Sequence, residues 1–267
     1  MKTVVITGSA RGLGLEMAKC FRGVNFNVVI SDLFKKDLHD AKKSLLKIKG
    51  LGDIDTLVCD ISKEGDIVNL IDKTSKKYGK IDFWINNAGI NQPDKKIWDL
   101  SNEEISRMID IDLKGTMIAS KLIAKVMMEQ GSGSIYNVEG HGSNDAIIPG
   151  LSVYGTAKRG VTYFTMALAK EMENAKCDVM VGRLSPGIMI TDFLVNAFRN
   201  KKIELSKKNK KVYNILGDYP SVVAKFLVNR MIANTNNNVR INWLTGGKAM
   251  KKFMLAAFNK RDFFKEK

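Results

Sequence analysis

Lys2-Thr-Val-Val-Ile-Thr-Gly-Ser-Ala-Arg-Gly-Leu-Gly14 is the stretch that decides the fold. Its first half contains the short apolar run Val4–Ile6, which is typical of a strand buried on both faces. Three glycines follow, and the apolar positions of residues 15–21 then have helical spacing. Glycine lets a phosphate approach the backbone, and a helix N-terminus favours negative charge. The stretch therefore predicts a dinucleotide site at a strand–turn–helix junction.

The rest of the chain alternates between strand and helix patterns. Candidate strands lie at 27–31, 55–59, 81–85, 133–138, 177–184 and 240–244. Candidate helices lie at 35–49, 63–78, 101–130 and 154–174, and Ser101 before two glutamates indicates an N-cap. Repeated strand–helix units predict one α/β domain over 1–267, a three-layer doubly wound (Rossmann) parallel sheet of about seven strands.

Composition narrows the class of protein. The chain has 267 residues, 45% of them hydrophobic, which is ordinary for a globular protein. Its three cysteines are far apart and form no CxxC pair, so we expect free thiols and no metal site. Because a strand pattern begins at once and no apolar run reaches the length of a spanning helix, we expect no signal peptide and no transmembrane segment. These features predict a cytoplasmic protein.

The charge is strongly basic and clustered. Lys and Arg total 43 against 28 Asp and Glu, a net charge of +15. The excess gathers at 199–211 and at 248–267, where lysines alternate with Phe, Met and Leu. One interpretation is a solvated lysine-rich surface, and the alternative is weak contact with a membrane surface. We expect no nucleic-acid partner, because no recognition motif accompanies the charge.

Acidic and small residues at strand ends predict how a dinucleotide is held. Asp32 ends the second strand, where a carboxylate can bind both ribose hydroxyls of an adenosine and would repel a 2′-phosphate. This favours NAD, whereas Arg11 in the glycine turn argues for NADP because it could pair with that phosphate. Asp60 after the third strand is placed to cap the adenine edge, and residues 87–89 to line the adenosine side of the cleft.

Tyr154 and Lys158 carry the catalytic signal. Residues four apart on a helix lie on one face, one turn from each other. A tyrosine with a pKa near ~10 is a poor base at neutral pH. A neighbouring ammonium and an oxidised nicotinamide would favour the phenolate and lower the pKa of Tyr154. The pair therefore predicts proton transfer to or from an alcohol or ketone.

Together these motifs resemble the short-chain dehydrogenase/reductase family over nearly the whole chain. The matching residues are Thr7-Gly-Ser-Ala-Arg-Gly-Leu-Gly14, Asp60, Asn86-Asn-Ala-Gly89, Tyr154-x-x-x-Lys158 and Ser185-Pro-Gly-x-x-x-Thr191. Three further stretches, 136–143, 185–192 and 242–246, are similar to the chlorophyll b reductase-like branch of that family. That similarity concerns the scaffold, and a chlorophyll substrate does not follow from it.

The resemblance implies roles for individual residues. It implies that Tyr154 is the acid/base and that Lys158 holds the ribose and lowers the pKa of the tyrosine. The implied cofactor-binding residues are Gly8, Ala10, Arg11, Gly12, Leu13, Gly14, Asp32, Asp60, Ile61, Asn87, Ala88, Gly89, Tyr154, Lys158, Pro186, Gly187, Ile188 and Thr191. The cofactor expected is NAD, with NADP as the alternative.

The chain departs from the family pattern at two places. Asp112 stands where the family usually has an asparagine whose main-chain carbonyl holds a water leading to the lysine, a role that an aspartate could keep. His141 stands thirteen residues before Tyr154, where the family has its substrate-orienting serine. Ser143 could replace that serine if the loop is reshaped, or His141 could donate a hydrogen bond to the substrate oxygen. His141 as a solvent-exposed loop residue is the further alternative.

Residues 189–219 are expected to form a lid over the nicotinamide end. The segment mixes lysines with seven apolar side chains: Phe193, Leu194, Phe198, Ile203, Tyr213, Ile215 and Leu216. This composition suits a small-molecule substrate that is bulky and hydrophobic with an acid group, such as a steroid or bile acid. The helices at 101–130 and 154–174 resemble the family's pairing surface, which implies a homodimer or homotetramer. A dinucleotide-binding sensor and a reductase at a membrane surface are the alternatives.

Overall fold

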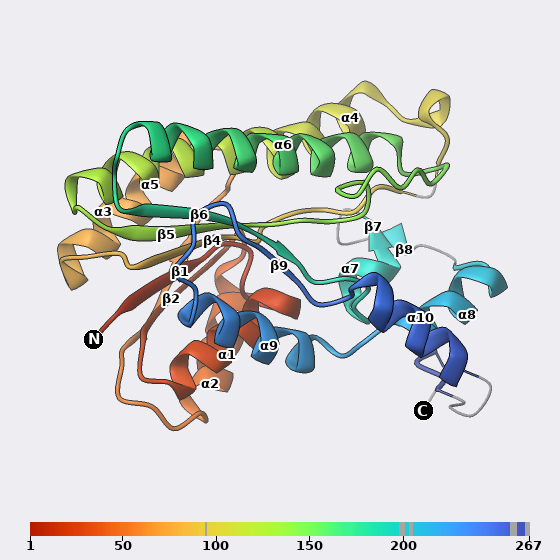
Figure 1. Ribbon diagram of the computed structural model, residues 1–267, viewed down its shortest axis with the longest axis horizontal. Helices are drawn as coiled ribbons and strands as arrows, with labels where there is room; N and C mark the ends of the chain where they lie inside the picture. Colours follow the sequence, from red (N-terminus) through yellow and green to blue (C-terminus); the bar gives the residue numbers. More distant parts are fainter. Residues whose placement is uncertain (94, 198–200, 203–204, 257–260, 265–267) are drawn as a thin grey trace.

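Seven parallel strands form one twisted sheet in the order β3-β2-β1-β4-β5-β6-β9 (Figure 1). The computed structural model describes residues 1–93, 95–197, 201–202, 205–256 and 261–264. The strands are β1 Thr3–Ile6, β2 Asn27–Asp32, β3 Ile54–Val58, β4 Phe83–Asn86, β5 Gly133–Val138, β6 Val179–Ser185 and β9 Arg240–Asn242. A short antiparallel pair, β7 Asn196–Ala197 and β8 Lys201–Lys202, lies apart from this sheet. The predicted doubly wound sheet of seven strands is confirmed.

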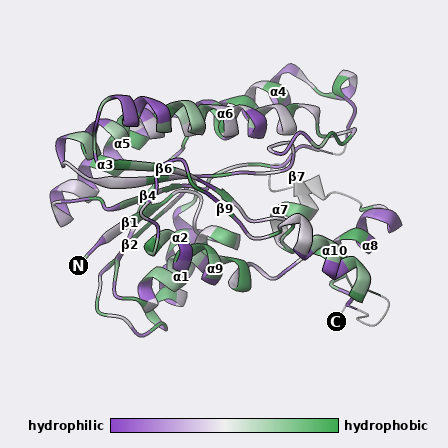
Figure 2. Cartoon of the chain, in the orientation of Figure 1, coloured by the Kyte–Doolittle hydropathy of each residue, from purple (hydrophilic) through white to green (hydrophobic). Residues whose placement is uncertain are grey.

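Helices cover both faces of the sheet (Figure 1). The helical segments are α1 Gly12–Gly23, α2 Lys35–Leu46, α3 Glu64–Tyr78, η1 Ile97–Asp99, α4 Asn102–Ile109, η2 Asp110–Gly115, α5 Thr116–Glu129, α6 Ser152–Asn174, α7 Asp192–Val195, α8 Lys207–Leu216, α9 Pro220–Ile232 and α10 Gly246–Leu255. One face carries α1, α2 and α9, and the other carries α3, α5 and α6. Figure 2 shows the strands and the inward helix faces as the hydrophobic part of the chain.

Strand β1 contributes side chains to the hydrophobic cores on both faces of the sheet. Val4 and Ile6 pack into the core beneath α1, α2 and α9, whereas Val5 packs into the core beneath α3, α5 and α6. All three side chains are fully buried. Side chains alternate between the faces of a strand, so a strand buried on both sides must be apolar at every position. The continuous apolar run therefore marks a central strand of a three-layer fold.

Two segments differ from the sequence expectation, and two other features confirm it. The helix expected over 101–130 is interrupted by the π-helical turn η2, so that α4 and α5 flank a widened segment at Asp112. The expected cap is present, since Ser101 and Glu104 form a reciprocal capping box. Helix α9, which packs against α1, was not predicted from the sequence; it begins at Pro220, a residue favoured at the first helical position. Strand β9 confirms the seventh strand expected near 240–244.

The segment after β6 and the end of the chain form a lobe at the carboxyl edge of the sheet. Helices α7, α8 and α10 lie there, and Figure 1 shows α8 and α10 side by side. Among the described residues, no helix is long and apolar enough to cross a membrane. Of the predicted lid residues, Phe198 and Ile203 lie outside the described residues.

Candidate active site

The glycine turn between β1 and α1 requires two glycines for close approach. Gly8 has a φ of +59°, and a Cβ placed on it would lie 2.6 Å from the Cα of Ala88. A Cβ on Gly14 would lie 2.6 Å from the Nδ2 of Asn87. The Asn87 amide donates to the carbonyl of Gly8 at 2.9 Å, which ties the turn to the end of β4. The backbone of the turn is therefore packed against residues 87–88, as the sequence predicts for one dinucleotide cleft.

Thr7 joins the same two segments from the strand side. Its hydroxyl oxygen accepts hydrogen bonds from the backbone N–H groups of Asn87 and Ala88, each at 3.1 Å. Its side chain is buried. On the other side of the turn, a Cβ on Gly12 would lie 3.9 Å from the Cγ2 of Thr191, so the segment after β6 reaches the start of α1. The residues predicted to bind the pyrophosphate and those predicted to bind the nicotinamide are thus neighbours at the carboxyl edge of the sheet.

Asp32 stands at the end of β2 and faces the glycine turn. One carboxylate oxygen accepts from the backbone N–H of Ala10 at 3.2 Å, and the other accepts from that of Leu33 at 2.8 Å. These bonds fix the carboxylate beside the turn. The arrangement fits a ribose whose two hydroxyls donate to an acid. Arg11, which precedes α1 in extended conformation, is exposed.

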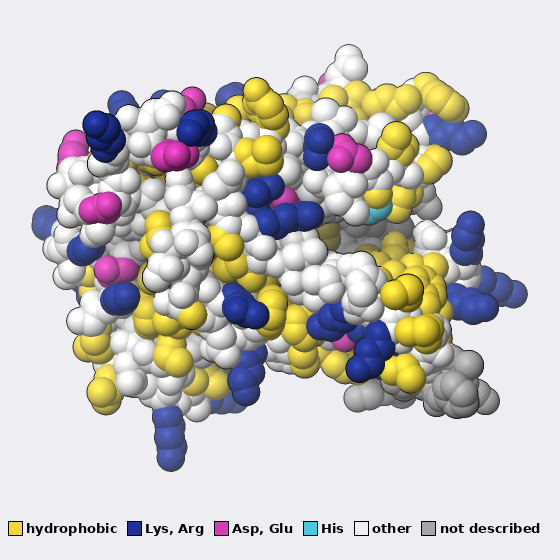
Figure 3. Space-filling model, viewed as in Figure 1, with side chains coloured by type: hydrophobic (Ala, Val, Ile, Leu, Met, Phe, Trp, Pro, Cys, Tyr) yellow, Lys and Arg dark blue, Asp and Glu magenta, His cyan; other side chains and the backbone are white. Residues whose placement is uncertain are grey.

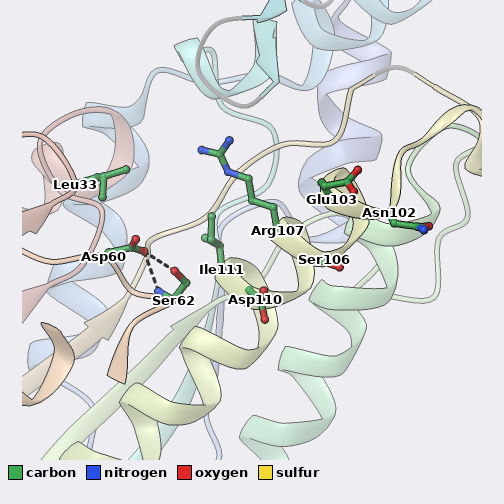
Figure 4. A pocket seen from close by; sticks show the side chains of 9 residues that line it. All are labelled: Leu33, Asp60, Ser62, Asn102, Glu103, Ser106, Arg107, Asp110 and Ile111. Carbon is green, nitrogen blue, oxygen red and sulfur yellow. Dashed lines mark hydrogen bonds between the residues drawn. The ribbon is translucent and has the colours of Figure 1, made fainter. Parts of the chain in front are cut away.

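A cavity of about 420 Å³ opens beside Asp60, between the ends of β2 and β3 and helix α4 (Figure 4). Asp60 accepts from the Ser62 backbone at 3.1 Å and the Ser62 hydroxyl at 2.7 Å, which fixes its carboxylate at the wall. Leu33 and Ile111 supply apolar lining, and Arg107 extends from α4 into the opening (Figure 4). The size and lining fit an adenine.

Sequence reasoning found only Asp60 among the lining residues of this cavity. Leu33, Arg107 and Ile111 were missed because no motif marks them; they come together only when α4 packs beside β2 and β3. Leu33 directly follows Asp32, which is the one signal that was available. Ile61, predicted to bind the cofactor, has its side chain buried in the core beneath α3, so only its backbone can reach the cleft.

Helix α6 presents the predicted catalytic pair on one buried face. Tyr154 is 7% and Lys158 5% exposed, and the Nζ of Lys158 lies 5.7 Å from the Tyr154 ring centre. The amide oxygen of Gln92, buried and not foreseen from the sequence, accepts from the backbone N–H groups of Val153 and Tyr154 at 3.0 and 3.1 Å. This side chain satisfies first-turn N–H groups that have no partner within the helix. It thereby fixes the start of α6 and the position of Tyr154.

Asp112 forms a buried ion pair with Lys158. Its Oδ2 lies 3.2 Å from the lysine Nζ, and its Oδ1 accepts from the backbone N–H of Ile90 at 2.8 Å. The carboxylate is completely buried, and burial raises the pKa of Asp112. A Cβ on Gly89 would lie 3.1 Å from that Oδ2, so Gly89 leaves the space beside the pair open. The main-chain carbonyl of Asp112 accepts from the hydroxyl of Thr116 at 3.2 Å.

The pKa of Tyr154 is shifted in the direction opposite to that predicted from Lys158. Burial raises the pKa of Tyr154 above its ordinary value, and the negative charge of Asp112 raises it further. The sequence pattern shows the ammonium but not the carboxylate that lies against it. This raised pKa is that of the protein without cofactor, so the lowering expected from Lys158 together with an oxidised nicotinamide stays a prediction.

The two candidates for the missing serine occupy different environments. The Ser143 hydroxyl donates to the carbonyl of Lys158 at 3.1 Å and accepts from the N–H of Gly140 at 3.2 Å, so its proton is used within the protein. His141 Nε2 is buried and has no hydrogen-bond partner among the described residues. Burial lowers the pKa of His141, which keeps the imidazole neutral at pH 7. A Cβ on neighbouring Gly140 would overlap the hydroxyl of Tyr154, so this loop lies directly against the catalytic side chain.

The segment after β6 closes one end of the site. Gly187 has a φ of +71°, and a Cβ on it would lie 2.7 Å from the Cβ of Leu244. Pro186 is buried, and the carbonyl of Ile188 accepts from the N–H of Asp218, which joins the two ends of the lid. Phe193 of α7 lies 6.1 Å from the Tyr154 ring, measured between ring centres. The lid thus places an aromatic side chain beside the proposed acid/base. Figure 3 shows the surface hollowed between the sheet and this lobe.

Residues 2–202 match the family of short chain dehydrogenases. The chain therefore belongs to the short-chain dehydrogenase/reductase family, whose fold and motif order it carries. Sequence identity to individual relatives indicates which branch of the family the chain resembles. It is 35% identical over 97% of its length to the chlorophyll(ide) b reductase NOL of Oryza sativa subsp. japonica, of which it covers 76%. It is 31% identical over 99% of its length to the probable chlorophyll(ide) b reductase NYC1 of the same organism.

The similarity to the chlorophyll b reductase-like branch is thereby confirmed. The chain covers 54% of the rice NYC1 relative, so it spans about half the length of that protein. Among solved structures, the fold matches a 3-ketoacyl-(acyl-carrier-protein) reductase from Brucella melitensis complexed with NADH. The TM-score is 0.78 at 26% identity, covering 93% of this chain and 98% of that one. Levodione reductase matches with a TM-score of 0.79 at 25% identity, covering 93% and 98%.

The residues present fit a nicotinamide dinucleotide. The glycine turn leaves backbone accessible at the start of α1, Asp32 is held beside that turn, and the cavity beside Asp60 fits an adenine. At the other end, the Nζ of Lys158 lies 3.4 Å from the position of a Cβ on Gly89, and Tyr154 is one helical turn before that lysine. The prediction of an NAD(P)-dependent short-chain dehydrogenase/reductase is supported at the level of the family and its nicotinamide cofactor.

Proposed function

We propose that this protein reduces a ketone or aldehyde to an alcohol with NADH. One observation carries the reaction: Tyr154 and Lys158 share one buried face of helix α6, with the lysine ammonium 5.7 Å from the centre of the phenol ring and Asp112 paired to that ammonium. A phenol placed in this way can give its proton to a carbonyl oxygen as a general acid.

The chain's own residues supply the proton and the geometry. The reduced nicotinamide, when bound, supplies the hydride for the carbonyl carbon. The O–H bond of Tyr154 breaks as its proton moves to the carbonyl oxygen, which completes the alcohol. The ammonium of Lys158 then lies within reach to restore charge balance beside the phenolate, and Asp112 holds that ammonium in place. Helix α6 and Gln92 fix the tyrosine so that little reorganisation is needed.

We assign the contact with the substrate oxygen to His141 and a structural role to Ser143. His141 has a neutral imidazole with a ring nitrogen that has no partner among the described residues, whereas the Ser143 proton is engaged by the carbonyl of Lys158. We expect His141→Ala to lower kcat/KM for the carbonyl substrate by at least ~tenfold without changing the melting temperature. Ser143→Ala instead lowers the melting temperature. A result with these two effects exchanged would assign the contact to Ser143.

The cofactor proposed is NAD rather than NADP. The Asp32 carboxylate is held by the N–H of Ala10, close to where the adenosine ribose would lie. Two ribose hydroxyls can donate to this acid, and a 2′-phosphate would be repelled. Arg11 is exposed and can turn toward solvent.

The substrate proposed is bulky and hydrophobic with an acid group, of which a steroid or bile acid is an example. Phe193 beside Tyr154 gives the lid an aromatic contact at the reacting end. The four exposed lysines of α8 add positive charge to the same lobe. Both features suit a hydrophobic molecule that carries a carboxylate. The relatives named as chlorophyll(ide) b reductases are compatible with a large carbonyl substrate.

We also propose that two copies pair through α5 and α6. These helices expose apolar side chains: Met117, Met128, Tyr163 and Met166. A dimer or a tetramer built on this pairing would be measured by light scattering on a sizing column.

The three cysteines are free, which is compatible with a reducing compartment. A cytoplasmic location remains a prediction.

Steady-state assays test the proposed reaction. The purified chain is offered keto-steroids, keto-bile acids, acyl thioesters and small sugars with NADH and with NADPH. We expect turnover of the bulky hydrophobic ketones, and loss of that turnover in Tyr154→Phe with cofactor binding retained. Turnover of small polar polyols alone would overturn the substrate class. Cofactor binding with no turnover of any carbonyl compound would favour a dinucleotide sensor.

A further inference from the structure

Helix α10 turns its apolar side chains outward. Met250, Phe253 and Met254 are 63%, 50% and 64% exposed, and the neighbouring Leu255 is 48% exposed. The spacing i, i+3, i+4 places the first three on one face of the helix. An amphipathic helix of a globular protein normally buries such a stripe against the core. We refer to these four side chains as the α10 stripe.

The inward face of α10 is charged instead. Lys252 donates to the carboxylate of Asp218 and to the carbonyl of Leu216 at 2.9 Å, and Lys248 lies over the ring of Trp243. The indole N–H of Trp243 donates to the same Asp218 at 2.7 Å. These polar contacts fix the rotation of the helix about its own axis. The outward position of the stripe is therefore determined by specific inward contacts.

Exposed basic side chains lie on the same lobe as the α10 stripe. Helix α8, which packs beside α10, exposes Lys207, Lys208, Lys210 and Lys211 (Figure 1). Lys251 is exposed on α10 itself. Neither helix contains an Asp or a Glu. Figure 3 shows the same association, with hydrophobic and basic side chains gathered on the lobe that carries these two helices.

We propose that the α10 stripe and the lysines of α8 form a docking site for an anionic lipid surface. Lysines around exposed Phe, Met and Leu match a helix lying at the boundary of headgroups and acyl chains. Each lysine near such a surface adds attraction to anionic headgroups. Because neither helix carries an acidic residue, α8 and α10 present one sign of charge, which a surface of anionic headgroups complements. A nucleic acid would leave the apolar stripe without a matching surface.

The docking site is joined to the proposed substrate lid. Asp218, which holds Lys252 of α10, also pairs through its backbone with Ile188 and Ile190 at the other end of the lid. A lipid-bound α10 would therefore bring the lid and the hollow behind it close to the bilayer surface. This link rests on the proposed function, in which the enzyme reduces a bulky hydrophobic substrate, because such a substrate would partition into the bilayer surface. The docking site itself needs neither substrate nor cofactor.

Vesicle sedimentation of the full chain tests the proposal. We expect binding to vesicles of phosphatidylcholine mixed with phosphatidylglycerol, weakening with salt, and little binding to phosphatidylcholine alone. Substituting Met250→Ser, Phe253→Ser and Met254→Ser together should reduce binding at least ~tenfold. The matched control Leu46→Ser/Leu51→Ser removes two apolar side chains that are 62% and 79% exposed at the other end of the molecule, and should bind as the parent does.

A second variant covers the case in which the triple substitution impairs folding. Lys210→Glu/Lys211→Glu changes only exposed side chains and should weaken binding to the anionic vesicles with an unchanged melting temperature. Binding that is unaffected by both variants, or equal on both kinds of vesicle at low salt, would overturn the proposal. So would a dimer that the triple substitution dissociates, or binding to duplex DNA in place of vesicles. Sedimentation uses no substrate, so its failure leaves the proposed reductase untouched.

Discussion

The carboxylate of Asp112 lies 3.2 Å from the ammonium of Lys158, and neither side chain is more than 7% exposed. An isolated charge at this depth would be costly, and each member of the pair offsets that cost for the other. The pair also changes the electrostatic potential at the hydroxyl of Tyr154, because the positive charge of Lys158 is opposed by the nearby negative charge of Asp112. The site therefore combines a catalytic lysine with a tyrosine whose pKa is raised.

Asp112→Asn should shift the pH dependence of catalysis toward acid. Asparagine keeps the bond from the N–H of Ile90 but removes the charge that raises the pKa of Tyr154. With a lower pKa, the tyrosine loses its proton at a lower pH, so carbonyl reduction should fall off roughly one to two pH units earlier. The reverse oxidation should gain rate at lower pH by the same shift. pH profiles of kcat in both directions measure this.

The control for this variant is Asp110→Asn. Asp110 is on the same helical segment but is 43% exposed and pairs with Lys114 at 3.3 Å. A surface pair of this kind contributes little. Its loss should leave both pH profiles unchanged. Identical profiles for the parent and the Asp112 variant would show that the carboxylate does not act on Tyr154.

Asp32→Ser should relax the choice of cofactor. Removing the carboxylate takes away the acceptor for two ribose hydroxyls and the repulsion of a 2′-phosphate. We expect KM for NADH to rise about tenfold and KM for NADPH to fall, with kcat for the same substrate nearly unchanged, because Asp32 lies far from the reacting atoms. Asp40→Asn, an exposed acid on α2, is the matched control and should alter neither KM. A parent enzyme that already prefers NADPH would contradict the role of Asp32.

The parallel sheet of about seven strands and the shared helix face of the catalytic pair could be predicted because both follow from local sequence pattern. A buried run such as Val4–Ile6 must become a central strand, and Tyr154 and Lys158 share a helix face by spacing alone. The contact between Asp112 and Lys158 joins two helices and depends on the π-helical turn η2, which no periodicity of the sequence reveals.

The orientation of α10 was unpredictable for a related reason. The sequence shows only lysines alternating with apolar residues over 248–267, and in the structure the inward contacts of Lys248 and Lys252 leave the apolar side chains on the outward face. Which face of an amphipathic helix is buried depends on its neighbours, here Asp218 and Trp243, and these are set by tertiary packing. In the same way, the bond from Ser143 to the carbonyl of Lys158 depends on how the loop folds onto α6.

Gly8→Ala should weaken both folding and cofactor binding. An alanine there would have to adopt a φ of +59° and place its Cβ 2.6 Å from the Cα of Ala88. Strain of this kind costs about 1–3 kcal/mol, so the free energy of unfolding should fall by at least that amount. Gly65→Ala is the control: nothing lies within 4 Å of its Cβ position, and an alanine in helix α3 should stabilise by about 0.5–1 kcal/mol. Denaturant titration of both variants measures the difference, and equal stabilities would refute the tight packing of the glycine turn.

Gly140→Ala should impair catalysis more than stability. A Cβ at this position would overlap the hydroxyl of Tyr154 and lie 2.9 Å from the Cγ of Lys158, so both catalytic side chains must move. Both side chains come from helix α6 and lie against the loop after β5, so their displacement need not disturb the strands of the sheet. A displacement of about 1 Å at reacting atoms costs roughly 100-fold in rate, so kcat should fall by about that factor while the melting temperature changes little. Gly155→Ala adds the same methyl group one residue beyond Tyr154, where the nearest atom is 3.9 Å away, and should retain full activity. Full activity in Gly140→Ala would mean that the tyrosine hydroxyl acts from another position than the one beside this loop.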